Sequence, residues 1–133
     1  MRFDQDFRSP SGITILDAIE CMVATLGPPG PNVLLCSTVD KDGIVGPGNC
    51  FDLRGAPPSY DCVFQLAASL GAPAVLCGSR AAHSLLEPDD ADFRLTRWLM
   101  DGAVRSNISL AEHIIVKDDM FRVMKKSLEE GLR

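Results

Sequence analysis

A short apolar run at residues 74–77 constrains the fold more than any other part of the chain. It stands between two segments with helical patterns, and it contains no polar residue. Such a run is typical of a strand buried on both faces of a sheet. Residues 33–39 and 109–116 are also expected to be strands, and each is joined to a further short run by a polar turn, which predicts two hairpins. The sequence therefore predicts an α/β domain in which helices cover a mixed β-sheet.

Three helices are expected from apolar residues at helical spacing. Thr14 is placed to cap the first helix, 15–26, which ends at Gly27. Ser59 is placed to cap the second, which ends at Gly71. The third begins at Asp89 and reaches about residue 104. Its broad apolar surface predicts burial on two sides, in part against another subunit. Residues 1–12 are expected to be an extended lead-in, 13–133 the domain, and 127–131 a short closing helix.

Composition narrows the class of protein. The 133 residues suit one domain, and 46% hydrophobic with 23% charged residues is typical of a soluble globular protein. The net charge of −5 and the lack of a basic cluster argue against nucleic-acid binding. No apolar run approaches the ~20 residues that span a bilayer. The five cysteines form no close pairs or zinc-site cluster, so we expect free thiols and a cytoplasmic protein, with Cys36 and Cys77 as small buried hydrophobes.

The later part of the chain carries a family resemblance. Leu-Thr-Arg at 95–97 lies in the third expected helix and is followed at 108–116 by Ile-Ser-Leu-Ala-Glu-His-Ile-Ile-Val. With Met120-Phe121, the 70–76 segment and the 33–45 hairpin, this pattern resembles the RadC-like branch of the JAB (MPN/JAMM) domain family. The resemblance covers residues from about 9 to the end. It implies a single JAB-type, cytidine-deaminase-like domain.

The resemblance also implies a zinc site, and this chain departs from it. In the family two histidines and an aspartate hold zinc, which activates water for attack on an amide-type bond, and an upstream glutamate acts as acid and base. No acid occurs near residues 48–49, where the glutamate would lie. The two histidine positions, the serine of the turn, the proline and the aspartate fall on Ser79, Ala81, His83, Pro88 and Asp92 respectively. Two of the three ligands are therefore missing, which predicts a degenerate site without metal.

Other readings of the same segment stay open. A turn at 78–80 could hold a carboxylate or phosphate through Ser79, Arg80 and His83. Asp92 could instead be a first-turn carboxylate of a helix capped by Asp89. Ser79 could act as a nucleophile with His83 as its base. An unusual zinc site could draw its ligands from Asp92, Asp89, His83 and Cys77. His113, in an apolar strand, is expected to be packed, with one hydrogen-bond partner.

The function expected from these residues is that of a catalytically silent JAB-fold scaffold or protein-interaction module. A homodimer or another protein is its expected partner, and no cofactor is expected. One alternative is a zinc-dependent, isopeptidase-like metallohydrolase with unusual ligands. Another is an accessory protein of DNA repair, which the acidic charge balance opposes.

Overall fold

The computed structural model describes residues 12–54 and 60–131. Within them the chain has an α/β fold built on a mixed six-stranded sheet and four helices, which confirms the predicted fold class. The lead-in at 1–11, the loop at 55–58 and the Ser59 cap lie outside the described residues. The described strands are β1 (Ile13–Thr14), β2 (Val33–Val39), β3 (Ile44–Asp52), β4 (Ala74–Arg80), β5 (Ser109–Lys117) and β6 (Met120–Val123). The described helices are α2 (Ile15–Leu26), α3 (Tyr60–Leu70), α4 (Asp90–Ser106) and α5 (Met124–Gly131).

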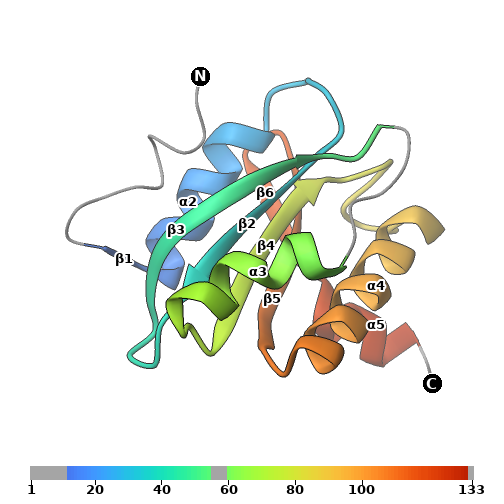
Figure 1. Cartoon of the computed structure of the whole chain (residues 1–133). Coiled ribbons are helices and arrows are strands. Elements are labelled where there is room, and N and C mark those ends of the chain that lie inside the picture. Colours follow the sequence, from blue (N-terminus) through green and yellow to red (C-terminus); the bar gives the residue numbers. More distant parts are fainter. Residues whose placement is uncertain (1–11, 55–59, 132–133) are drawn as a thin grey trace.

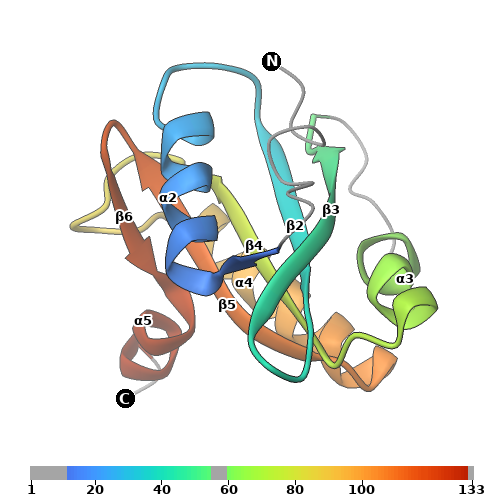
Figure 2. The same cartoon turned by 90° about the vertical axis from the view of Figure 1, so that its left-hand side faces the viewer.

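The sheet is mixed because only one pair of neighbours is parallel. Its strand order is β1-β3-β2-β4-β5-β6, with β4 and β5 parallel and the other neighbours antiparallel. Both predicted hairpins, β2–β3 and β5–β6, are present. Helix α2 covers one face of the sheet, while α3 and α4 cover the other (Figures 1 and 2). Strand β4 therefore lies inside the sheet and is buried on both faces, as its apolar sequence predicts.

Two cores follow from the alternation of side chains along the strands. One core joins α2 to one face of the sheet and includes Met22, Leu26, Leu35, Leu76 and Ile114. The other joins α3 and α4 to the opposite face and includes Leu34, Phe64, Cys77, Leu99 and Leu110. Successive residues of β4 thus face different helices, and this alternation decides where each residue of the candidate site points.

Helix α4 buries a single stripe of side chains. The buried residues recur at helical spacing on one side of the helix, and Val104 on another side is 81% exposed. The predicted burial on two sides is therefore not seen within the described chain. The residues of the buried stripe are Asp92, Thr96, Leu99, Gly102 and Ala103. Asp92 and Thr96 in this stripe are polar, so the buried side of α4 contributes hydrogen-bonding groups as well as apolar contacts.

Strand β4 is longer than its apolar run. The sequence predicted a turn at 78–80, but β4 continues to Arg80. That prediction was wrong because β4 keeps partners on both sides, with Ser79 opposite Leu34 and Arg80 opposite Val116. Gly78 serves close packing, since a Cβ there would lie 2.8 Å from the sulfur of Met22 on α2. The closing helix also differs, beginning at Met124 rather than at 127.

Gly27, at the end of α2, provides a test of this packing. An added Cβ at Gly27 would lie 1.9 Å from the backbone oxygen of Asp118, in the β5–β6 turn. We therefore expect Gly27→Ala to lower the free energy of unfolding by more than about 2 kcal/mol in urea denaturation. Gly43 has a φ of +78° and open space around it, so Gly43→Ala should lose only about 1–2 kcal/mol of conformational energy. Equal stability of Gly27→Ala and the unmodified chain would contradict the close approach.

Candidate functional site

The candidate site lies at the carboxyl ends of the parallel strands β4 and β5, beside the start of α4. In α/β sheets this is the edge at which ligands commonly bind. A cleft of about 390 Å³ opens there. It is lined by Gly30, Asn32, Leu53, Arg80, Ala81, Ala82, Ala91, Asp92 and Leu95. The positions that the resemblance gives to the zinc ligands of the family, Ser79, Ala81 and Asp92, lie at the same edge.

A buried chain of hydrogen bonds connects β4, β5 and α4 beneath this edge. The Ser79 hydroxyl lies 2.8 Å from Nε2 of His113, and the Thr96 hydroxyl lies 2.7 Å from Nδ1 of the same ring. All three side chains are at most 1% exposed. His113 was predicted to be packed with one partner; it is packed, but both of its ring nitrogens have partners. The imidazole is therefore fully satisfied by protein groups.

The hydroxyl of Thr96 determines which tautomer His113 adopts. Thr96 donates its hydroxyl hydrogen to the backbone oxygen of Asp92, 2.9 Å away. Its oxygen can therefore only accept from the ring, so His113 carries its proton on Nδ1 and Nε2 accepts from Ser79. Burial lowers the pKa of His113 from 6.5 to about 3, because a charged ring would lose its hydration. His113 is thus a neutral structural histidine at ordinary pH.

Nearby backbone N–H groups form hydrogen bonds to the side chain of Asp92. Its carboxylate accepts from the N–H of Ala82 at 3.1 Å and from the N–H of Asp89 at 3.1 Å. The Asp89 side chain in turn accepts from the first turn of α4, which completes a capping box. Burial raises the pKa of Asp92, while the two backbone hydrogen bonds oppose that rise. The first-turn role predicted for Asp92 is confirmed.

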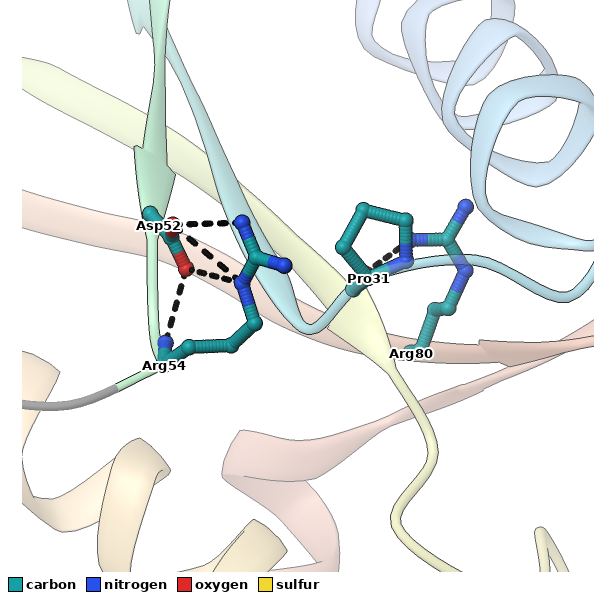
Figure 3. A network of polar contacts seen from close by, with 4 residues as sticks. All are labelled: Pro31, Asp52, Arg54 and Arg80. Atoms are coloured by element: carbon teal, nitrogen blue, oxygen red, sulfur yellow. Dashed lines mark hydrogen bonds and ion pairs between the residues drawn. The ribbon is translucent and has the colours of Figure 1, made fainter.

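Arg80 holds the loop between α2 and β2. Its guanidinium donates to the backbone oxygens of Thr25 at 3.4 Å and Pro28 at 3.0 Å, and also to that of Pro31. Figure 3 shows the guanidinium directed at Pro31. The oxygen of Thr25 belongs to the last turn of α2, and those of Pro28 and Pro31 belong to the loop that follows. Carbonyls at the end of a helix lack helical partners, and a cation there is favourable. Arg80 therefore acts as a C-terminal cap for α2 and as the anchor of this loop.

The three residues predicted as an anion site are not brought together. Ser79 faces α4 and Arg80 faces α2, because adjacent residues of a strand point to opposite faces. His83 is exposed, and its backbone oxygen accepts from the Lys117 ammonium group at 2.7 Å. The Ser79 hydroxyl is 1% exposed and its partner is His113 rather than His83, so a substrate cannot reach it as a nucleophile.

A zinc ion does not fit the donors at this edge. Among residues 12–54 and 60–131, no three His, Cys, Asp or Glu side chains converge in a way that could hold a metal. Ala81 offers no donor, and both oxygens of Asp92 already accept backbone hydrogens. Cys77 lies deeper in the sheet with its sulfur against Cys36. Asp92, Asp89, His83 and Cys77 are therefore not assembled as a zinc site.

An ion pair at the end of β3 lies near the rim of the cleft. Arg54 donates to Asp52 from its backbone N–H at 2.8 Å and from its guanidinium at 2.9 Å (Figure 3). These hydrogen bonds lower the pKa of Asp52. Both side chains are more than half exposed, and such a pair contributes little to stability. Leu53, between the two, donates its backbone N–H to the backbone oxygen of Asn32, 2.9 Å away, and both residues line the cleft.

Thr96 and His113 are the site residues that sequence reasoning did not assign. Thr96 lies at helical spacing from Leu99 and Ala103 in the third helix, and His113 directly precedes two isoleucines in a strand. Each is a polar residue at a position whose spacing predicts burial, and buried polar groups require partners. That signal identifies both as members of a buried network, but it does not pair them.

Comparisons give no assignment of family. No protein-family model matches the chain, and no curated protein sequence matches it. Among the described helices, none has the length and apolar character that crossing a membrane requires.

The lowered pKa of His113 predicts how stability depends on pH. The unfolded ring binds its proton near pH 6.5 and the folded ring only near 3, so stability is complete above about 6.5 and falls as the pH drops. Between pH 6.5 and 5 the loss from this group is about 2 kcal/mol, measurable by urea denaturation. Asp92 acts in the opposite sense, since its pKa is raised and the folded carboxyl binds its proton first.

Two substitutions separate the histidines in this experiment. His113→Gln should remove most of the loss between pH 6.5 and 5, whereas His83→Gln, at an exposed histidine, should keep it. An unchanged pH profile in His113→Gln would show that His113 is not held neutral.

Proposed function

We propose that this chain is a non-catalytic, RadC-like JAB-domain protein that acts as a protein-interaction module. The resemblance of residues 95–97 and 108–116 to that family supports the JAB assignment, and the observed order of helices and strands is compatible with it. The proposal takes the cytoplasm as the compartment, because the sequence favours free thiols.

The observation that carries the non-catalytic proposal is that the side chains of Ser79, Arg80 and Asp92 are all used within the fold. Ser79 is bonded to His113, Arg80 to three backbone oxygens, and Asp92 to two backbone N–H groups. A hydrolytic site needs a ligand, base or nucleophile with a free lone pair facing substrate. These side chains stabilise the fold instead, which leaves the surface as the functional part of the molecule.

Metal analysis tests the non-catalytic proposal. The full chain is loaded with zinc, dialysed and assayed for bound metal, alongside Asp92→Ala. We expect no stoichiometric zinc in either protein, because the carboxylate oxygens already accept backbone hydrogens. One equivalent of zinc that survives dialysis in the unmodified chain and is lost in Asp92→Ala would overturn the proposal and favour the metallohydrolase.

The edge of the sheet at β6 is the surface we assign to interaction. Met120 is 63% exposed and Phe121 43% exposed on this last strand. Leu86 is 86% exposed, and Arg122 of β6 donates to its backbone oxygen at 3.1 Å, so the loop carrying Leu86 lies against the strand. Exposed apolar side chains beside a strand edge are a site for pairing with another chain.

A second copy of this chain is the partner we propose for the β6 edge. A strand can pair with its own copy about a two-fold axis in antiparallel orientation, so the surface is complementary to itself without further requirements. Pairing would satisfy the outer backbone groups of β6 and cover Met120 and Phe121, and it would join two sheets into one.

Light scattering on the purified chain tests this pairing. We expect the mass of a dimer at high protein concentration. Met120→Lys should shift the protein to monomer, because a charged residue on an edge strand opposes pairing. Leu70→Lys is the matched control, since Leu70 is 55% exposed at the end of α3, and it should remain dimeric. A monomeric unmodified chain, or a dimeric Met120→Lys protein, would contradict the proposed interface.

A further inference from the structure

Two cysteines face each other across the middle of the sheet. Cys36 on β2 and Cys77 on β4 are directly opposed in the antiparallel register. Their sulfur atoms lie 3.2 Å apart, and the two residues are 4% and 0% exposed. The cysteines are 41 positions apart in the sequence, so their approach comes from the pairing of the strands.

The backbone is already spaced for a covalent bond between them. Directly opposed residues of antiparallel strands have Cα atoms about 4.5–5.5 Å apart. Disulfides span Cα separations of about 4.4–6.8 Å, with a sulfur–sulfur bond of about 2.05 Å. The two sulfur atoms, now 3.2 Å apart, therefore need to approach by only about 1 Å to reach bonding distance.

We propose that Cys36 and Cys77 form an oxidation site, a latent cross-strand disulfide that locks β2 to β4 when the protein meets a hydroperoxide. Strand β4 carries Ser79 and Arg80 just beyond Cys77, so the lock fixes the strand on which the candidate site is built. The inference rests on the geometry of the thiol pair alone and does not depend on the proposed function.

The chemistry needs one molecule of hydroperoxide. One sulfur, as its thiolate, attacks the peroxide oxygen, breaks the O–O bond and becomes a sulfenic acid. The second sulfur then attacks the sulfenic sulfur, forms the S–S bond and releases the hydroxyl as water. With hydrogen peroxide, two thiols and one peroxide give one disulfide and two waters. The protein loses two hydrogen atoms, and dithiothreitol reverses the change.

Burial sets the rate of this oxidation. Loss of hydration and the neighbouring Cys77 raise the pKa of Cys36 well above its usual value, so little thiolate is present at neutral pH. A small oxidant such as hydrogen peroxide is therefore required, and the reaction should accelerate as the pH rises. Cys50 is exposed and lies opposite Leu35 rather than Cys36, on the other face of the sheet, which makes it a matched control.

The experiment treats the full native chain with hydrogen peroxide, blocks the remaining thiols by alkylation and maps the cysteine peptides by mass spectrometry. We expect a linked pair of peptides containing Cys36 and Cys77, two mass units lighter than the reduced pair, and reversal by dithiothreitol. Cys50→Ser should still form this link and Cys77→Ser should not. Recovery of Cys36 and Cys77 as alkylated thiols, while Cys50 is oxidised, would overturn the proposal.

A second measurement on the unmodified chain keeps the test independent of the variants. A bond closing a loop of this length restricts the unfolded chain, so the oxidised protein should unfold at a higher urea concentration than the reduced protein. Cys50→Ser should show the same rise. A linked protein with an unchanged or lower urea midpoint would show that the bond does not act as a lock.

Discussion

The hydrogen bonds of the buried His113 ring organise the region where this sheet ends. An imidazole without access to water has to find a partner for each nitrogen, since an unmet buried polar group costs roughly 1–3 kcal/mol. Here the partners come from different elements, Ser79 on β4 and Thr96 on α4, while the ring itself belongs to β5. The requirement of one side chain thus fixes two strands and a helix relative to one another.

The same requirement for hydrogen-bond partners explains why few polar side chains at the end of β4 are free to bind a ligand. Ser79 has its hydroxyl committed to the ring, and Asp92 is committed to the backbone of the loop that enters α4. Arg80, on the opposite face, is committed to the loop that leaves α2. Each of these three side chains joins two parts of the fold. Of the polar side chains that line the cleft, those of Arg80 and Asp92 therefore have most of their hydrogen-bonding capacity used within the fold.

The strands and helices of this fold could be predicted where local chemistry decides them. The apolar run of β4, the polar turn of the β2–β3 hairpin and the capping pair of Asp89 and Asp92 each act through neighbours in the sequence, and the structure confirms all of them. The end of β4 could not be predicted in this way. Ser79 and Arg80 continue the strand because distant groups, a ring on β5 and the carbonyls of a loop, satisfy their side chains.

The candidate site was predictable in its location but not in its connections. A polar residue at a position that is expected to be buried, such as Thr96 or His113, indicates that a buried partner exists. The spacing of residues along one element does not say which residue of another element that partner is. The exposure of Leu16, 71%, illustrates the same limit on α2. It lies at helical spacing from the apolar residues of α2, yet it is exposed while Ala18 and Ile19 nearby are buried.

Long-range ¹H–¹⁵N correlation spectroscopy of the histidine rings reports directly on the buried His113 network. We expect His113 to stay neutral with its proton on Nδ1 down to pH 5, and added zinc to leave its resonances unchanged. A charged His113 ring at pH 5, a proton on Nε2, or a zinc-dependent shift would contradict the buried network and the non-catalytic function that we propose from it.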